Sequence, residues 1–409
     1  MNNKTSEIDP LIIANMQFQT GYFTDAEKSY KKVLDKDPKN FQALVQLGNL
    51  ALYSNKFTEA KKWLLQANEL EPKEPAPHAL LAEMYYRLDN FQDAAKHLRN
   101  YGIEDMALRL ESFKGSQPYL VESNEDIFKI TLLQVDPLPV IEIKINGKEK
   151  VNFLIDTGAA ETMIDVDYAK ENNLEIFGEK IGTFAGGKKA TTYQGKVGSL
   201  TLGNLTIKNM PVGILPIRPI SQIFGGLRID GIIGTVLFYH FITTLDYTKG
   251  ELILRTNTNE NLKEFYEENK KVKITEIPFW MAEDHFMVAW GRVNKGEKTL
   301  FFLDTGLAGG GFTGAKATLE QAKVVLDEAN ASEGIGGGGK VRVVPFEVEE
   351  LTFGGAVEKN IKGLFTDNFP IEYKLGFRIG GIISHQFFKS YSLTFDFLNM
   401  KFLLIKKEN

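Results

Sequence analysis

The chain has 409 residues, a formal net charge of −5 at pH 7 and no cysteine. This length gives room for two or three domains, and an apolar share of 43% is enough to build their cores. The acidic balance argues against a nucleic-acid partner, and the absence of cysteine excludes disulfides and thiol chemistry. Because the N-terminus is polar and no run of residues is apolar enough for a membrane span, we expect a cytoplasmic protein, or a periplasmic or secreted one if a leader has been removed.

The N-terminal quarter of the chain repeats a pattern every 34 residues. Small and aromatic residues recur at this spacing, at Ala26, Ala60 and Ala94 and at Phe23, Phe57 and Phe91. Proline closes the first two units, at Pro38 and Pro72. A period of this length, with small residues at helix crossings and proline at turns, resembles the tetratricopeptide repeat. The resemblance implies an all-α solenoid of three units in residues 1–105.

Asparagine also recurs in this pattern, as Asn15 and Asn49, with Glu83 at the third position. In the tetratricopeptide family the helix concerned lines a concave groove, which implies that the two asparagines contact a bound peptide. The alternative is that both are solvated helix positions. The resemblance therefore implies a protein partner on the repeats, and no more specific ligand.

Residues 106–125 contain Gly115, Ser116 and Pro118 and predict a linker. Strand-like patterns then fill residues 126–256 and 272–409, with a Glu-, Asn- and Lys-rich helical connector predicted at 257–271. Because the helical period stops before the strand patterns begin, we expect residues 126–409 to fold without the repeats.

The strand-rich part contains the tripeptide Asp-Thr-Gly twice, at Asp156-Thr157-Gly158 and at Asp304-Thr305-Gly306. A hairpin pattern precedes each copy, and an Arg-Ile-x-Gly-Ile-Ile segment follows each, at residues 228–233 and 378–383. Several matched features in one order indicate a duplicated lobe. The alternative is an unrelated duplicated β-barrel.

This pairing resembles the two halves of an aspartic protease active site, as found in the superfamily that includes pepsin and the retroviral proteases. Over the whole chain, the resemblance is to bacterial two-lobed aspartyl proteases with tetratricopeptide repeats. It implies a multidomain protein, in which an all-α tetratricopeptide-repeat solenoid precedes a mainly-β, pseudo-two-fold protease made of two β-barrel-like lobes.

The resemblance also implies roles for the two tripeptides. Asp156 and Asp304 would share one proton and activate the water that hydrolyses a peptide bond of a peptide or protein substrate. Their neighbours Thr157, Gly158, Thr305 and Gly306 would support them, with the threonines hydrogen-bonded across the two lobes. This chemistry requires no cofactor and no metal. Since one chain carries both aspartates, we expect a monomer.

Each lobe has a glycine-rich stretch after its tripeptide, at residues 182–187 and 334–339. The resemblance implies that these stretches are flaps over the substrate, and the candidate contact residues are Phe184, Gly186, Gly187, Gly336 and Gly337. The alternative is a pair of mobile surface loops. A phosphate-binding loop is excluded because no Gly-Lys-Ser/Thr closes either stretch.

The second lobe departs from the family pattern in two places. Leu307 follows its tripeptide where Ala159 follows the first, and Ser384 stands where the first lobe has Gly234. Two alternatives to an active monomer remain: an inactive peptide-binding scaffold with this fold, and a protease whose aspartates meet between two chains. The histidines lack metal-ligand spacing, which disfavours a metalloprotease.

Overall fold

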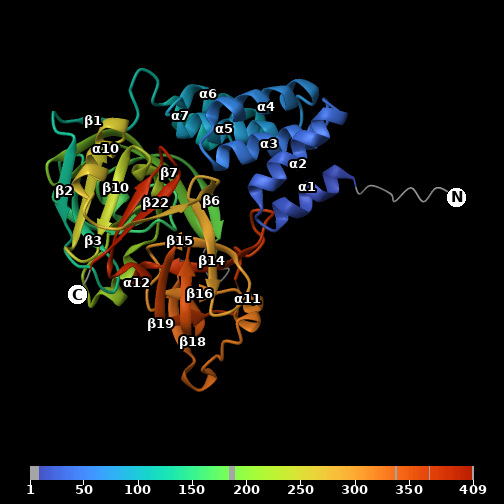
Figure 1. Cartoon of the computed structure of the whole chain (residues 1–409). Coiled ribbons are helices and arrows are strands. Elements are labelled where there is room, and N and C mark those ends of the chain that lie inside the picture. Colours follow the sequence, from blue (N-terminus) through green and yellow to red (C-terminus); the bar gives the residue numbers. More distant parts are fainter. Residues whose placement is uncertain (1–8, 184–188, 337–338, 368, 408–409) are drawn as a thin grey trace.

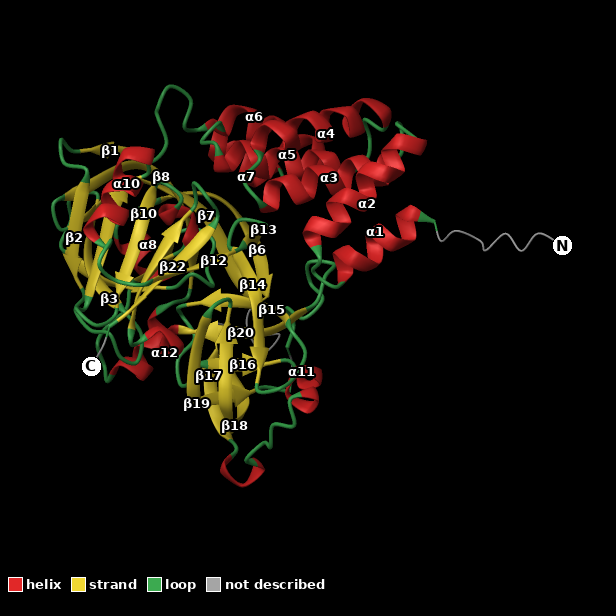
Figure 2. Ribbon diagram, in the orientation of Figure 1, coloured by secondary structure: helices red, strands yellow, loops and turns green. Residues whose placement is uncertain are grey.

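The computed structural model describes residues 9–183, 189–336, 339–367 and 369–407. A helical module lies beside two lobes that are built mainly of strands (Figure 1). Nearly all of the long helices belong to this module, whereas the lobes contain short ones (Figure 2). Among the described residues, no helix is long and apolar enough to cross a membrane.

The helical module consists of helix pairs that follow the 34-residue period. Its helices are α1 (Pro10–Gln19), α2 (Phe23–Lys36), α3 (Phe41–Tyr53), α4 (Phe57–Leu70), α5 (Pro75–Arg87), α6 (Phe91–Tyr101) and α7 (Glu104–Glu111). The recurring alanines are fully buried or nearly so, as helix crossings require. At Gly48 of α3, a Cβ would lie 2.5 Å from Leu64 of α4, so glycine permits the close approach of the two helices. These features confirm the expectation of a repeat solenoid.

The first lobe contains an eight-stranded sheet in the order β1-β8-β5-β9-β4-β3-β7-β6, as far as the structure describes it. Its strands are β1 (Leu120–Glu122), β3 (Val140–Ile145), β4 (Lys150–Ile155), β5 (Met163–Asp165), β6 (Glu175–Thr183), β7 (Lys189–Leu202), β8 (Leu205–Leu215) and β9 (Gly231–Ile233). The short helices α8 (Val166–Glu171), η2 (Arg218–Phe224) and α9 (Thr235–Phe238) connect them.

The second lobe repeats this arrangement in the order β13-β14-β15-β20-β16-β19-β18-β17, again within the described ranges. Its strands are β13 (Trp280–Ala282), β14 (Phe286–Val293), β15 (Thr299–Asp304), β16 (Phe312–Gly314), β17 (Ser332–Gly336), β18 (Gly339–Phe353), β19 (Ala356–Phe365) and β20 (Ile379–Ser384), with helices α11 (Lys316–Gln321), η3 (Glu328–Asn330) and α12 (His385–Phe388). In both lobes the strand before the tripeptide is parallel to a later apolar strand, as β4 with β9 and β15 with β20. The duplication inferred from the motifs is thus a duplication of topology.

A third sheet joins the lobes, in the order β12-β22-β21-β10-β11-β2. The first lobe provides β2 (Ile127–Thr131), β10 (Phe241–Asp246) and β11 (Glu251–Thr256), and the second provides β12 (Ile274–Pro278), β21 (Tyr391–Asp396) and β22 (Lys401–Lys406). At its centre β10 runs antiparallel to β21, and the hydroxyl oxygens of Thr244 and Thr394 lie 2.8 Å apart. Equal contributions from the two halves give this sheet a pseudo-two-fold axis.

The segments predicted as a linker and a connector have regular structure. Helix α7 extends into residues 106–125, and strand β1 lies within them. Strand β1 pairs with β8 of the first lobe. Helix α10 (Asn259–Glu268) occupies most of 257–271, and it buries Leu262 and Phe265 against the sheet that joins the lobes.

The helical module shares its core with the lobes, although the sequence predicts that residues 126–409 fold without the repeats. One apolar cluster joins Phe18, Phe23 and Tyr53 of the helices to Leu300 and Phe377 of the second lobe. A larger cluster continues from the last helix pair into the first lobe. The sequence did not reveal this contact because each helix pattern shows a buried face but not the element that covers it.

Candidate active site

The two Asp-Thr-Gly tripeptides meet at the interface between the lobes. Asp156 directly follows β4, and its amide nitrogen donates a hydrogen bond to the carbonyl oxygen of Ile233 in β9, at 3.0 Å. Asp304 ends β15 in the matching place beside β20. Both aspartates are partly exposed, whereas the threonines that follow them are fully buried. Each aspartate is therefore fixed by two parallel strands and still open to a ligand.

The two carboxyl groups are hydrogen-bonded to each other. Each lies against the glycine of the opposite tripeptide: a Cβ on Gly306 would be 2.1 Å from Cγ of Asp156, and one on Gly158 would be 2.6 Å from Oδ2 of Asp304. Each also accepts a hydrogen bond at 2.8 Å from the amide of its own glycine. Glycine is required here because the carboxyl groups occupy the space of a side chain.

The threonines hold the two tripeptides together across the interface. The Thr305 hydroxyl accepts a hydrogen bond from the Thr157 amide at 3.0 Å, and the Thr157 hydroxyl accepts one from the Thr305 amide at 3.0 Å. Each hydroxyl also donates to a carbonyl oxygen of the other lobe, that of Leu303 at 3.1 Å and that of Ile155 at 3.2 Å. This symmetric set of bonds lies within one chain.

Burial raises the pKa of both aspartates. Burial is the largest cause for Asp156, and the hydrogen bonds that it accepts limit the rise. For Asp304 the negative charge of Asp156 adds to burial, and its pKa lies well above the ordinary value of 3.8. Two adjacent carboxyl groups in this setting share one proton.

The departures of the second lobe from the family pattern compensate each other. In the first lobe, a Cβ at Gly234 would lie 2.3 to 2.8 Å from the carbonyl oxygens of residues 159–161, so a serine could not fit. In the second lobe the loop after Asp304 is longer, and the hydroxyl of Ser384 donates to the carbonyl oxygen of Gly310 within it. The altered loop thus accommodates the altered strand, and Asp304 keeps its place.

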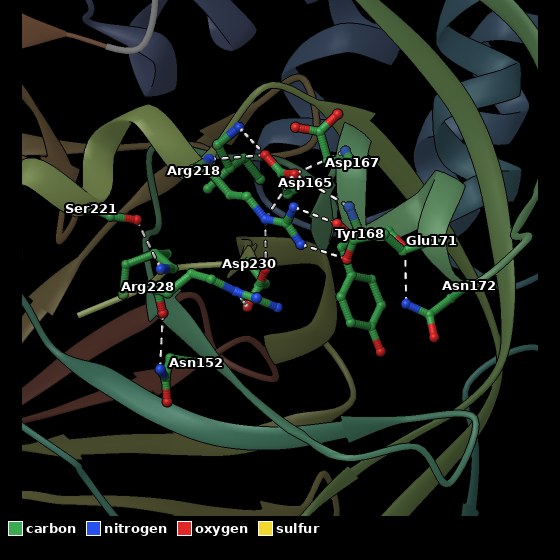
Figure 3. Close-up of polar contacts among 12 residues, drawn as sticks. Asn152, Asp165, Asp167, Tyr168, Glu171, Asn172, Arg218, Ser221, Arg228 and Asp230 are labelled. Carbon is green, nitrogen blue, oxygen red and sulfur yellow. Dashed lines mark hydrogen bonds and ion pairs between the residues drawn. The ribbon is translucent and has the colours of Figure 1, made fainter. Parts of the chain in front are cut away.

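A cluster of polar side chains connects three elements of the first lobe (Figure 3). Asp230, from the recurring Arg-Ile-x-Gly segment, accepts from Arg218 at 3.0 Å and from Arg228 at 2.8 Å. Asp165 accepts from the amides of Ile217 and Arg218, at 2.7 and 2.8 Å. These bonds tie η2 to β5 and to the start of β9. Their role is structural, because both carboxylates are already neutralised or capped.

The other residues predicted for binding belong to the two glycine-rich stretches and to the repeats. Phe184, Gly186, Gly187 and Gly337 lie outside the described residues, and Gly336 ends β17, where it pairs with Gly339. Within the helical module, the Asn15 side-chain oxygen accepts from the hydroxyl of Tyr30 at 2.7 Å, and Asn49 donates to the hydroxyl of Tyr53 at 3.2 Å. Both asparagines are thus engaged inside the module.

Sequence reasoning missed two residues close to the dyad. His285, in the turn between β13 and β14, lowers the pKa of Asp156 by its charge, and its Nδ1 lies 2.7 Å from the carboxylate of Asp284. Glu161 lies five residues after Asp156 and is buried. The sequence could have indicated Glu161, because it is an ionisable residue soon after the first tripeptide. It could not have indicated His285, which is distant from Asp156 in the chain and is brought near it only by the fold.

Two lobes with paired Asp-Thr-Gly tripeptides, behind a helical solenoid, give an architecture similar to that of two-lobed aspartic proteases with a repeat module. Comparison with known families agrees: residues 141–237 match the aspartyl protease model, and residues 17–84 match the tetratricopeptide repeat model. The chain therefore carries an aspartyl protease domain behind tetratricopeptide repeats. No curated protein matches the chain significantly.

Proposed function

We propose that this protein is an aspartic endopeptidase that works as a single chain. The observation that carries the proposal is the dyad: two hydrogen-bonded carboxyl groups with raised pKa values, held by reciprocal threonine bonds across one intramolecular interface. Because one chain supplies both aspartates, a second chain is not needed to complete the site. The helical module would then serve the protease or its interaction with other proteins.

The geometry supports a direct attack by water. The ionised Asp156 takes a proton from a water molecule held between the carboxyl groups, while the protonated Asp304 donates a hydrogen bond to the scissile carbonyl oxygen. The water oxygen bonds to the carbonyl carbon and gives a tetrahedral intermediate. The carbon–nitrogen bond then breaks as the leaving nitrogen receives the proton that Asp156 had taken. No covalent bond to the protein forms in this sequence.

The proposal is tested by replacing each aspartate separately with asparagine. We expect the wild-type protein to cleave members of an unstructured peptide library, and D156N and D304N each to lose this activity while their circular dichroism is unchanged. Each carboxyl group has a task that the other cannot perform, so both losses should be complete. Wild-type protein that folds but cleaves no peptide would instead support the scaffold alternative.

A second measurement separates the single-chain enzyme from one assembled between chains. Activity per mole should not change with protein concentration, and the active species should have the mass of one chain, 45.9 kDa. Mixing D156N with D304N should not restore cleavage. Recovery on mixing would show that a dyad can form between two chains, contrary to the proposal.

A further inference from the structure

The catalytic loop of the first lobe is held by its backbone and by one buried side chain, Glu161. The amides of Thr235 and Val236 donate to the carbonyl oxygens of Ala159 and Ala160, at 3.0 and 2.9 Å. These bonds connect the loop to the start of α9. The next residue is Glu161, whose side chain is almost completely shielded from solvent. Its carboxylate therefore fixes the end of the loop that begins at Asp156.

Among the described residues, the partners of the Glu161 carboxylate come from the helical module. Arg109 of α7 donates to its two carboxylate oxygens through both terminal nitrogens, each at 2.7 Å. The hydroxyl of Tyr86 in α5 donates to Oε1 at 2.5 Å. Arg109 is fully buried and also donates to the carbonyl oxygen of Val212 in β8, at 3.1 Å. Two elements of the module thus bind one carboxylate of the catalytic loop.

This ion pair is better explained by geometry than by stability. Removing two charges from water costs about as much as their attraction returns, so an apolar pair of similar volume would stabilise the fold equally well. A planar guanidinium bound through two parallel hydrogen bonds, however, fixes both the position and the orientation of the carboxylate. An apolar pair would not.

The module contacts other segments around the dyad as well. Asp105 of α7 lies against Gly178 in β6, where a Cβ would be 2.3 Å from Cγ of Asp105. Strand β6 leads to the glycine-rich stretch of the first lobe. On the other side, Arg87 of α5 donates to the carbonyl oxygens of Met281 and Glu283 in the second lobe, next to His285. One helical module thus binds both halves of the site.

We propose that Arg109 and Tyr86 are positioning residues of the protease: through Glu161 they hold the first-lobe catalytic loop in its productive geometry. This inference rests on the proposed peptidase activity. It makes the helical module part of the catalytic unit and not a detachable recruitment domain. The second lobe has no equivalent link among its described residues. The position that corresponds to Glu161, just before β16, is Gly311, which has no side chain to bind the helices. Loss of the contact with the helical module should therefore disturb Asp156 and not Asp304.

The deciding variant replaces both members of the pair, as R109M/E161M. It leaves no unpaired buried charge, so we expect a thermal midpoint near that of the wild type. The catalytic constant on a short peptide should nevertheless fall about 10- to 100-fold, because small displacements of reacting groups have effects of this size. KM should stay within about twofold. The acid limb of the pH profile should move, since Asp156 loses its fixed surroundings. Wild-type kcat and pH profile in this stable variant would overturn the inference.

Two further variants keep the test informative if the double variant is unstable. Y86F removes a single hydroxyl and should lower kcat severalfold with little change in the thermal midpoint. R99M is the matched control, because Arg99 forms ion pairs with Glu104 and Glu111 on the surface of the same module. It should leave kcat unchanged. Equal effects of Y86F and R99M on kcat would contradict a specific role for Glu161.

A measurement that needs no activity separates this inference from the proposed function. Amide hydrogen exchange at Thr235 and Val236 reports on the bonds to the catalytic loop. We expect faster exchange at both amides in R109M/E161M and in Y86F than in the wild type and R99M. If the wild type proves inactive but this difference is found, the peptidase proposal fails and the positioning remains. Unchanged exchange would refute the positioning.

Discussion

Truncation of Phe377 to alanine should destabilise the helical module and the protease together. Phe377 belongs to the second lobe and is fully buried among rings of the first repeats. Its ring centroid lies 5.9 Å from that of Phe18, 4.9 Å from that of Phe23 and 5.9 Å from that of Tyr53. The pairs with Phe18 and Phe23 are close to perpendicular, at 89° and 83°. The side chain thus connects two parts of the protein that the sequence suggests are separate.

The expected loss follows from this burial. Phenylalanine side chains of this kind lose about 3 to 5 kcal/mol on truncation, from apolar transfer and the cavity that remains. Edge-to-face ring pairs contribute about 0.5 to 1.5 kcal/mol each, so the upper half of that range is expected. A typical domain has only about 5 to 15 kcal/mol of stability, and the loss should therefore be evident.

The assay is denaturant unfolding followed by two signals. Far-ultraviolet circular dichroism near the helical bands reports mainly on the repeats. Tryptophan fluorescence reports on Trp280 and Trp290 in the second lobe once Trp63 of the helical module is replaced, as W63F, in both proteins compared. Both transitions should move together to lower denaturant in F377A. The control is Y373A, whose side chain is 64% exposed and which should change stability by less than about 0.5 kcal/mol. A helical transition that stays in place while the lobe transition moves would refute the shared core.

Two further predictions concern the dyad, and a third concerns the titration of Glu83 in helix α5. The rate of peptide cleavage should follow a bell-shaped pH profile, rising as Asp156 ionises above the ordinary value of 3.8 and falling as Asp304 deprotonates well above it; a flat profile would contradict the shared proton. Substituting Gly306 by alanine should reduce kcat at least about 100-fold, because the new Cβ would meet the Asp156 carboxylate at 2.1 to 2.4 Å; near-normal turnover would contradict the geometry. Burial raises the pKa of Glu83 to about 7, against the opposing charge of Arg87 and with additional repulsion from Asp284 and Glu283. The folded state therefore keeps a proton that the unfolded state releases, so its stabilising contribution is complete below about 4.5 and is lost as pH rises through 7. E83Q should remove up to roughly 3 kcal/mol of this pH dependence in unfolding titrations, and an unchanged slope would exclude Glu83 as its source.

The duplicated features of the sequence predicted the parts of the structure that repeat. Asp156 and Asp304 come together because both lobes place the tripeptide after one strand and beside a later parallel one, and this order is visible in the chain. Likewise, the recurring alanines indicate helix crossings because only small residues fit there. Patterns of this kind are local or periodic, so one sequence is sufficient to find them.

The contacts between the modules could not be predicted in the same way. Gly115, Ser116 and Pro118 made residues 106–125 look like a linker, although α7 ends only at Glu111 and buries Arg109 completely. The available signal was a short amphipathic pattern, with Ala107 and Leu110 both buried on one face of α7. Such a pattern shows that a face is covered but does not name the partner. Glu161 is 52 residues from Arg109 along the chain, and only the fold makes them neighbours.

The central sheet takes three strands from each lobe, and the two lobes belong to one polypeptide, so each lobe can evolve separately. In a symmetric pair of identical chains, every substitution appears on both sides, and any attached solenoid is present twice. A single solenoid has no two-fold axis, so it can contact two related lobes only through different surfaces, as Arg109 and Phe377 do here. Joining the lobes in one polypeptide frees each to acquire its own residues. The asymmetric attachment of the helices thus depends on the covalent fusion of the two halves.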